Sequence, residues 1–193
     1  MNSATEPFAK DGKNTTPAAV AEVAAMHGLA VLGAPDIVTA RTLAAQLIGE
    51  GVAPTTCLVS LQAHFPASVF GLHQNGALTG LLAAFPLNRI GLRAVEQACF
   101  DAVHLDLAQV AKPGEAPAAY YGWGFAATNK DGARAVLRAS IDIHRLLYWA
   151  TPTFARAVTA DGVRALSSIG FCPHPNQQGL FFIAPAAAPG LQL

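Results

Sequence analysis

The chain has 193 residues, a formal net charge of zero, a hydrophobic share of 52% and a charged share of only 12%. Its few, scattered Lys and Arg residues exclude the basic stripe that a nucleic-acid backbone requires, so no nucleic-acid partner is predicted. A surface this poor in charge favours self-association, which makes a homodimer a hypothesis.

The start of the chain differs in composition from the remainder. Residues 1–16 are rich in Ser, Thr, Asn and Gly, and they are predicted to form a flexible tail before a single domain over 17–193. They lack the apolar core and the basic end of a signal peptide. The first apolar stretch, 18–34, contains Glu22 and His27 and is too polar to cross a bilayer, so no membrane partner is predicted.

Apolar spacing and helix-ending residues predict several helices in the first half of the chain. A short extended segment over 29–34 separates the first helix from the second. The predicted helices span 17–27, 35–51, 54–65 and 89–100.

The clearest local signal is a hairpin. Two apolar runs, "SVFGLHQ" and "ALTGLLAAF", flank the dipeptide Asn75-Gly76. A type I′ turn needs positive φ at both central residues, and Asn-Gly satisfies that need better than most pairs. The pattern predicts antiparallel strands over about 68–74 and 77–85.

An aromatic strand is predicted over 118–127, after a stretch (101–117) that shows no clear periodicity. Simple alternation places Tyr121, Trp123, Phe125 and Ala127 on one face and Tyr120, Gly122, Gly124 and Ala126 on the other. The first face is bulky enough for the core. The second is nearly bare, and glycine inside a strand indicates a bulge or a close approach by a ligand or another backbone.

The last third of the chain predicts a long helix over 131–149, a strand over 153–158, a short helix that begins after Thr159, and a final strand over 179–185. Thr159 is a candidate N-cap. The turn before the long helix has two interpretations. Its free backbone N–H groups could hold a phosphate, or Thr128 or Asn129 could cap the helix while Asp131 complements its dipole.

This order of elements resembles the GCN5-related N-acetyltransferase (GNAT) superfamily over roughly residues 29–185. Three segments carry the resemblance: "HQNGALTGLL", "GFAATNKDGARAVLRA" and "ARAVTADGVRALSSIGF". It implies an α/β fold whose mixed, V-shaped central β-sheet is flanked by helices. It also implies acetyl-CoA or another acyl-CoA as co-substrate, bound between the fourth and fifth strands.

The resemblance implies an acyl-CoA-dependent N-acyltransferase that transfers an acetyl group to an amine of a small molecule or a protein. The acceptor itself is not indicated. By the same resemblance, the pantetheine arm lies along the aromatic strand and the pyrophosphate lies at the following turn. The cofactor-binding residues implied in this way are Phe125, Ala126, Ala127, Lys130, Asp131, Gly132, Ala133, Arg134 and Thr159.

The turn departs from the family's Arg/Gln-x-x-Gly-x-Gly/Ala pattern. One alignment starts at Asn129, which places Arg134 in a slot for a small residue. Another starts at Lys130 and places Ala133 and Ala135 in the small-residue slots. Both alignments stay open.

The catalytic groups of the family are missing at the matching positions. Leu166 stands where many members have the Tyr that protonates the CoA thiolate, and the 118–128 stretch has no carboxylate. No catalytic residue is therefore predicted. Two alternatives remain: a non-catalytic acyl-CoA-binding or regulatory module, and a structural or interaction protein whose cleft is plugged by its own side chains.

Cysteine and histidine patterns point to no further chemistry. The group around Cys99, Asp101 and His104 does not match a zinc spacing, so no metal is predicted. The three cysteines, Cys57, Cys99 and Cys172, follow no pairing pattern, which is typical of a reducing cytoplasm.

Overall fold

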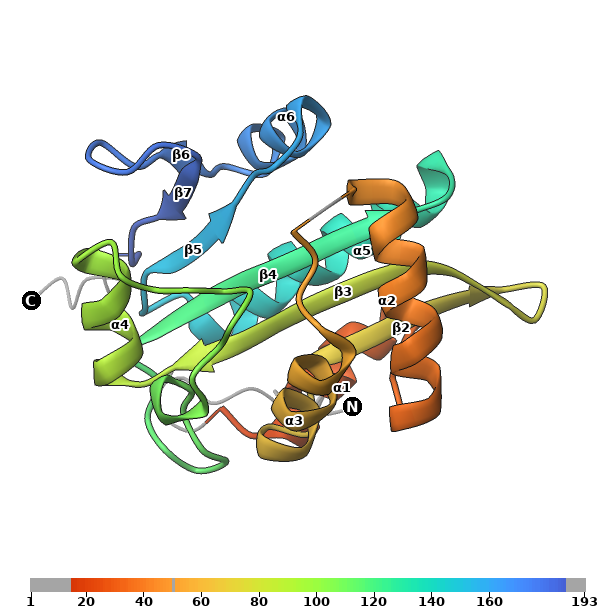
Figure 1. Ribbon diagram of the computed structural model, residues 1–193, viewed down its shortest axis with the longest axis horizontal. Helices are drawn as coiled ribbons and strands as arrows, with labels where there is room; N and C mark the ends of the chain where they lie inside the picture. The colour runs from red at the N-terminus through yellow and green to blue at the C-terminus, as the bar shows by residue number, and fades with distance from the viewer. Residues whose placement is uncertain (1–14, 50, 187–193) are drawn as a thin grey trace, which may run out of the picture.

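A seven-stranded mixed β-sheet forms the centre of the molecule (Figure 1). The computed structural model describes residues 15–49 and 51–186. The strands lie in the order β1-β2-β3-β4-β5-β7-β6, and every neighbouring pair is antiparallel except β4 and β5, which are parallel. The strands are β1 (Leu29–Val31), β2 (Val69–Gln74), β3 (Ala77–Leu87), β4 (Ala119–Ala127), β5 (Thr153–Arg156), β6 (Cys172–Pro173) and β7 (Leu180–Ile183).

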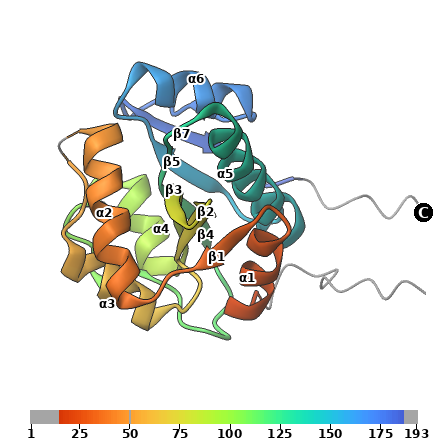
Figure 2. The same ribbon diagram turned by 90° about the vertical axis from the view of Figure 1, so that its right-hand side faces the viewer.

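Helices cover both faces of the sheet (Figure 2). One face carries α1 and α5, and the other carries α2, α3 and α4. None of the helices in the described residues is long and apolar enough to cross a membrane. The helices are α1 (Pro17–Ala25), α2 (Ala34–Ile48), α3 (Thr55–His64), α4 (Arg89–Glu96), α5 (Lys130–Ile143) and α6 (Ala160–Ser168), with a 3₁₀ turn η1 (Leu107–Gln109) and a π-helical turn η2 (His144–Tyr148).

The predicted hairpin is confirmed. Strands β2 and β3 pair antiparallel from Gln74 opposite Ala77 onward, and the turn residues Asn75 and Gly76 have φ values of 52° and 79°. Those angles are the left-handed conformations that favour Asn-Gly in a type I′ turn. The local turn chemistry therefore sets the register of the two longest apolar strands in the first half of the chain.

The last two residues of the predicted tail, Thr15 and Thr16, form hydrogen bonds with the domain. The Thr15 hydroxyl donates a hydrogen bond to the Leu147 carbonyl at 3.2 Å. The Thr16 hydroxyl accepts one from the Ala19 N–H at 3.2 Å and so caps α1. Residues 1–14, which hold the rest of the predicted tail, lie outside the described residues.

The simple alternation predicted for β4 is wrong. Ala83 pairs with Gly124 and Ala84 pairs with Gly122, which leaves Trp123 without a partner in β3. This extra residue is a β-bulge, and it reverses the facing of every residue that follows it. Phe125 therefore packs in the same cluster as Tyr120, on the α1–α5 face, instead of beside Tyr121.

Helix α4 packs closely against the backbone of η1 at Gly91. A Cβ atom built at this position would lie 2.3 Å from the Gln109 carbonyl oxygen, closer than any real contact. The absence of a side chain lets η1 lie directly against α4, in the stretch where the sequence shows no periodicity.

We expect Gly91→Ala to lower the free energy of unfolding by about 1–3 kcal/mol, because the new methyl group overpacks a backbone contact. Chemical denaturation followed by circular dichroism measures this change. Gly33→Ala is the matched control, because its added Cβ meets nothing closer than 3.8 Å and its φ is −77°. Equal stability of the two variants would contradict the proposed contact.

Candidate functional site

Strands β4 and β5 pair over only three residues and then separate. The parallel register runs from Tyr120 opposite Thr153 to Gly122 opposite Ala155. Beyond Gly122, β4 continues to Ala127 without a β5 partner, and Figure 1 shows the two strands diverging. An edge strand left unpaired in this way presents backbone N–H and C=O groups to whatever occupies the gap.

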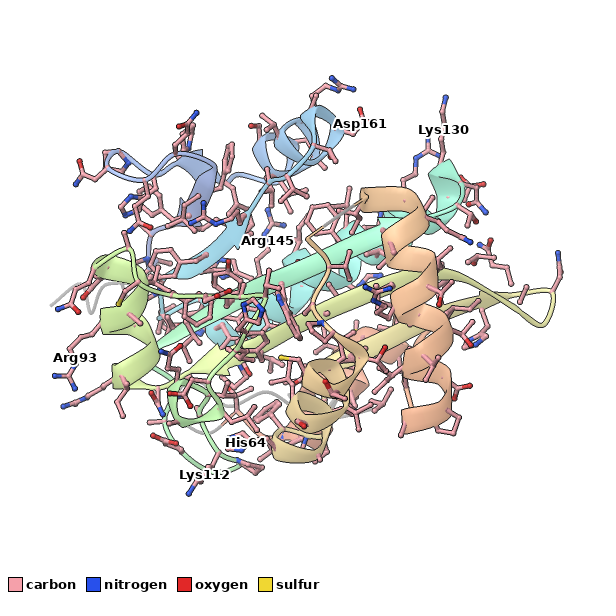
Figure 3. All side chains as sticks on the ribbon, in the orientation of Figure 1. His64, Arg93, Lys112, Lys130, Arg145 and Asp161 are labelled. Carbon is pink, nitrogen blue, oxygen red and sulfur yellow. The ribbon has the colours of Figure 1, made fainter. Side chains whose placement is uncertain are left out.

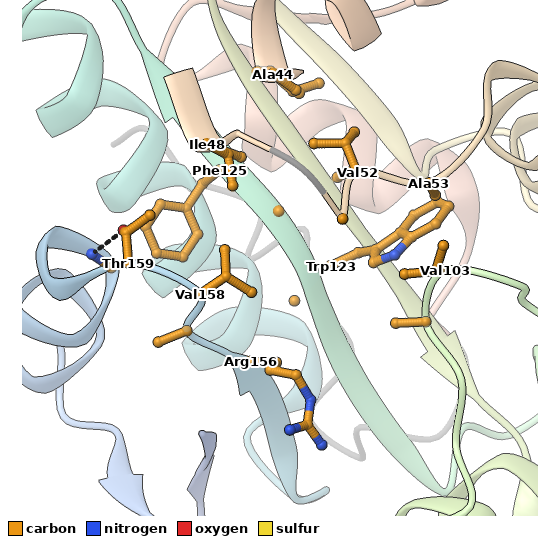
Figure 4. Close-up of a pocket in the computed structure, with 18 of the residues that line it drawn as sticks. Ala44, Ile48, Val52, Ala53, Val103, Trp123, Phe125, Arg156, Val158 and Thr159 are labelled. Atoms are coloured by element: carbon orange, nitrogen blue, oxygen red, sulfur yellow. Dashed lines mark hydrogen bonds between the residues drawn. The ribbon is translucent and has the colours of Figure 1, made fainter. Parts of the chain in front are cut away.

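A cavity of about 180 Å³ fills the gap between the diverging strands (Figure 4). Its floor is the β4 segment from Tyr121 to Phe125, which includes both strand glycines and the bulge. A Cβ atom added to Gly124 would meet no atom within 4 Å, so this glycine keeps space open inside the cavity. The two strand glycines, at which a close approach by a ligand or another backbone is predicted, thus line a cavity in the structure.

The two side walls of the cavity come from distant parts of the chain. One wall runs from the end of β5 into α6, through Arg156–Thr159, Gly162 and Leu166. The opposite wall is formed by α2, α3 and the segment between them, and sequence analysis did not identify it. Its members share an apolar side chain and a position on the α2–α3 side of the sheet; they include Ala44, Ile48, Val52, Ala53 and Leu58.

The electrostatics of the cavity depend on one residue. Among the described residues that line it, Arg156 is the single charged side chain. Burial raises the pKa of the Tyr121 hydroxyl, and the nearby Arg156 guanidinium partly offsets that increase. Arg156 therefore favours anionic groups in a cavity whose other described lining residues are uncharged.

Two of the nine predicted cofactor-binding residues line the cavity. They are Phe125, from β4 beyond the bulge, and Thr159, at the start of α6. Ala126 and Ala127 continue β4 in pairing with β3, opposite Leu81 and Gly80. The five turn residues, Lys130, Asp131, Gly132, Ala133 and Arg134, form the first turn of α5, outside the cavity lining.

The start of α5 caps itself. The Asn129 side chain accepts a hydrogen bond from the Gly132 N–H at 2.8 Å, and its Nδ2 group donates to Gln74 at 3.0 Å. Asp131 pairs with Arg134 at 2.8 Å, and both side chains are exposed. The predicted cap of this helix is therefore present, with Asn129 as the capping residue.

The start of α6 repeats the same arrangement. The Thr159 hydroxyl accepts a hydrogen bond from the Gly162 N–H at 2.9 Å, which confirms the predicted N-cap, and Asp161 pairs with Arg164. Figure 3 shows Lys130 and Asp161, from the first turns of α5 and α6, projecting outward at the same edge of the molecule. Two helix N-termini thus flank the open end of the gap between β4 and β5.

Leu166, which the resemblance aligns with a Tyr, is fully buried. It packs against Ala155, Phe171 and Phe181 and is 1% exposed. The described residues contain no group of three or more His, Cys, Asp or Glu side chains arranged to hold a metal ion. The cavity wall is therefore apolar at Leu166, and the polar side-chain groups among the lining residues belong to Tyr121, Trp123, Arg156 and Thr159.

One solved structure with a similar fold is the ribosomal-protein-S18-alanine N-acetyltransferase from Escherichia coli. The superposition has a TM-score of 0.53 with 16% sequence identity, and it covers 86% of this chain and 97% of that chain. The chain has the fold of the GNAT acetyltransferases. No family model matches the sequence, and no curated protein matches it. The fold implied by the resemblance, a mixed sheet flanked by helices, is confirmed.

A second cavity, of about 210 Å³, lies between α5, η2, the end of α6 and β7. Its polar lining comes from Ser140, His144, Arg145 and Thr153. The His144 Nδ1 atom lies 2.8 Å from the Thr153 hydroxyl, so the imidazole ties the π-helical turn to β5. Burial, and secondarily the Arg145 charge, lower the pKa of His144 below 6.5.

A lowered histidine pKa makes stability depend on pH. Between the folded and unfolded pKa values the unfolded chain binds more protons, so stability falls as pH drops below about 6.5. We expect His144→Asn to lose part of this pH dependence, measured as melting temperature from pH 7.5 to 5. His73→Asn, at an exposed hairpin position, controls for the loss of one histidine. Identical pH profiles for wild type and His144→Asn would contradict this assignment.

Proposed function

We propose that this protein is an acyl-CoA-dependent N-acyltransferase that transfers an acetyl group to an amine. The observation that carries the proposal is the separation of β4 and β5 after Gly122, with a glycine-lined cavity between them. The fold supports acyl transfer to an amine at the general level. Acyl-CoA as the donor is part of the proposal.

The proposed binding mode uses backbone groups. The unpaired edge of β4 beyond Gly122 pairs with the amide groups of the pantetheine arm, as an added strand would. The pyrophosphate lies at the open end of the gap, near the start of α5. There the amides of Lys130 and Asp131 have no acceptor among the described residues, because first-turn amides have no intrahelical partner and the Asn129 cap accepts from Gly132. These amides and the helix dipole favour an anion.

The proposed reaction is nucleophilic attack of a neutral amine on the thioester carbonyl. A C–N bond forms, the C–S bond breaks, and the proton lost by the amine balances the protonation of the CoA sulfur. The chain contributes alignment in a largely apolar cavity and backbone N–H groups for the developing oxyanion. A positioned acid adds about 10²–10⁴-fold in such reactions, so its absence at Leu166 slows the reaction without abolishing it.

The non-catalytic acyl-CoA-binding module is the second candidate. Buried Leu166 and the absence of a carboxylate from β4 favour it. The third hypothesis, a plugged cleft, receives no support, because a cavity lies between β4 and β5. Turnover with acetyl-CoA separates the first two candidates, and CoA binding is common to both.

The exposed cation at the start of α5 provides the first test. We expect Lys130→Glu to weaken CoA binding several-fold at low salt, since a partly exposed charge contact is worth about 0.3–1 kcal/mol and its sign is reversed. Isothermal titration calorimetry with CoA measures the effect. Lys112→Glu makes the same charge change at a distant edge (Figure 3) and should leave binding unchanged.

Asp131→Asn is the complementary variant in this experiment. It removes the nearest negative charge and releases Arg134 from its ion pair, so CoA binding should tighten. Higher salt should reduce the differences among the variants. If Lys130→Glu and Lys112→Glu bind CoA equally, the turn is only a connector. If wild type shows no heat with millimolar CoA, the acyl-CoA proposal is wrong.

Gly124 tests the cavity itself. We expect Gly124→Leu to abolish detectable CoA binding, because its side chain enters space that is now open. Gly124→Ala should cause a smaller loss, and both variants should keep a melting temperature near that of wild type, since the new Cβ meets no atom within 4 Å. Unchanged binding by folded Gly124→Leu would place the ligand elsewhere.

A further inference from the structure

The cavity has two chemically different ends (Figure 4). One end holds Thr159 and Phe125, close to the start of α6. The other end holds Trp123, Val103 and Arg156, and Figure 4 shows the Arg156 guanidinium directed away from Thr159. Since the proposed donor phosphates lie outside the first end, the second end is available to the acceptor.

The acceptor end disfavours a cation. None of the described residues that line the cavity is an Asp or a Glu, and the single charge there is positive. A polyamine or another multiply charged amine would leave its additional ammonium groups unpaired against an apolar wall. The Arg156 charge also lowers the pKa of a nearby amine, which favours the neutral form that attacks a thioester.

The Arg156 guanidinium is held in place by a hydrogen bond, and it keeps N–H donors that can bind an anion. Its Nη1 atom donates a hydrogen bond to the Gln178 carbonyl at 3.0 Å, which ties the side chain to the segment before β7. Among the described residues, no carboxylate lies within salt-bridge distance of it. A guanidinium donates five N–H groups, so donors remain for a carboxylate.

Tyr121 adds a second polar group on the same side of the sheet. It pairs with Phe154 across the two strands, and Arg156 follows Phe154 by two positions, so all three side chains share one face. Tyr121 and Arg156 both line the cavity, and Val52, Ala53 and Trp123 contribute apolar surface to the same lining. A ligand with an anionic group and an apolar group can thus place the first at Arg156 and the second against the apolar lining.

We propose that the acceptor is an apolar α-amino acid, whose carboxylate binds Arg156 and whose side chain contacts the apolar wall. This inference rests on the proposed acyl transfer and names its substrate class. The amine, adjacent to the carboxylate, faces the gap between β4 and β5. The reaction forms an N-acetyl amino acid and releases CoA with its thiol protonated.

Four acceptors test the assignment: leucine, its neutral amide leucinamide, its carboxyl-free analogue 3-methylbutylamine, and the polyamine spermidine. With acetyl-CoA, wild type should show a kcat/KM for leucine at least tenfold above that for leucinamide or 3-methylbutylamine, since a charge-assisted pair is lost. Spermidine should be the poorest acceptor. Free-thiol release and mass spectrometry of the acetylated product measure turnover.

Variants at Arg156 locate the carboxylate site. Arg156→Gln should lower kcat/KM for leucine at least tenfold, mainly through KM, and should lower kcat/KM for leucinamide much less, because leucinamide has no carboxylate to lose its partner. Arg156→Lys should restore part of the preference. Arg164→Gln removes an exposed guanidinium from α6 and should match wild type. Melting temperatures establish that each variant is folded. If Arg156→Gln does not fold, the preference for leucine over leucinamide is measured in Arg156→Lys instead.

The outcomes separate this inference from the proposed function. Equal use of leucine and leucinamide, or an equal loss of both in Arg156→Gln, overturns the carboxylate assignment while acyl transfer stands. Preferred acetylation of spermidine overturns it as well. If CoA binds in calorimetry and no acceptor reacts, the amino-acid assignment is overturned and the non-catalytic alternative is favoured. If CoA does not bind, the proposed function itself is wrong.

Discussion

The end of backbone pairing between β4 and β5 at Gly122 is the constraint on which the site depends. Every other neighbouring pair in the sheet is antiparallel. The β4–β5 pair is joined through α5, η2 and a short turn, so its register is set by how α5 packs on the sheet. With only three residue pairs, the two strands can diverge and leave part of β4 as an edge within the sheet.

The bulge at Trp123 adapts β4 to this gap. Before the bulge, Tyr121 packs on the α4 side with Phe85; after it, Phe125 packs on the α1–α5 side. One extra residue thus turns Phe125 to the α1–α5 side, while Gly124 leaves open space in the cavity. A strand with regular alternation would place Phe125 on the same face as Trp123.

The two helix N-termini at the open end of the gap each carry a side-chain cap without a ligand. Asn129 and Thr159 cap them, and an acidic residue in each first turn pairs with an arginine three positions later. These contacts stabilise the helices, and Asp131 and Asp161 also oppose the approach of an anion. A pyrophosphate at this place would therefore depend on the first amides of α5 and on Lys130, which makes salt and local charge decisive for affinity.

Local chemistry by itself determined much of the fold. The Asn75-Gly76 turn, the Thr159 cap and the order of the helices and strands follow from neighbouring residues, since turns and caps are satisfied within a few positions. The bulge, the apolar wall from α2 and α3, and the position of Arg156 were decided only by the tertiary structure. Each depends on the pairing of segments that are far apart in the chain. A register shift of one residue in β4 changes which side chains meet the cavity, and no local pattern specifies that shift.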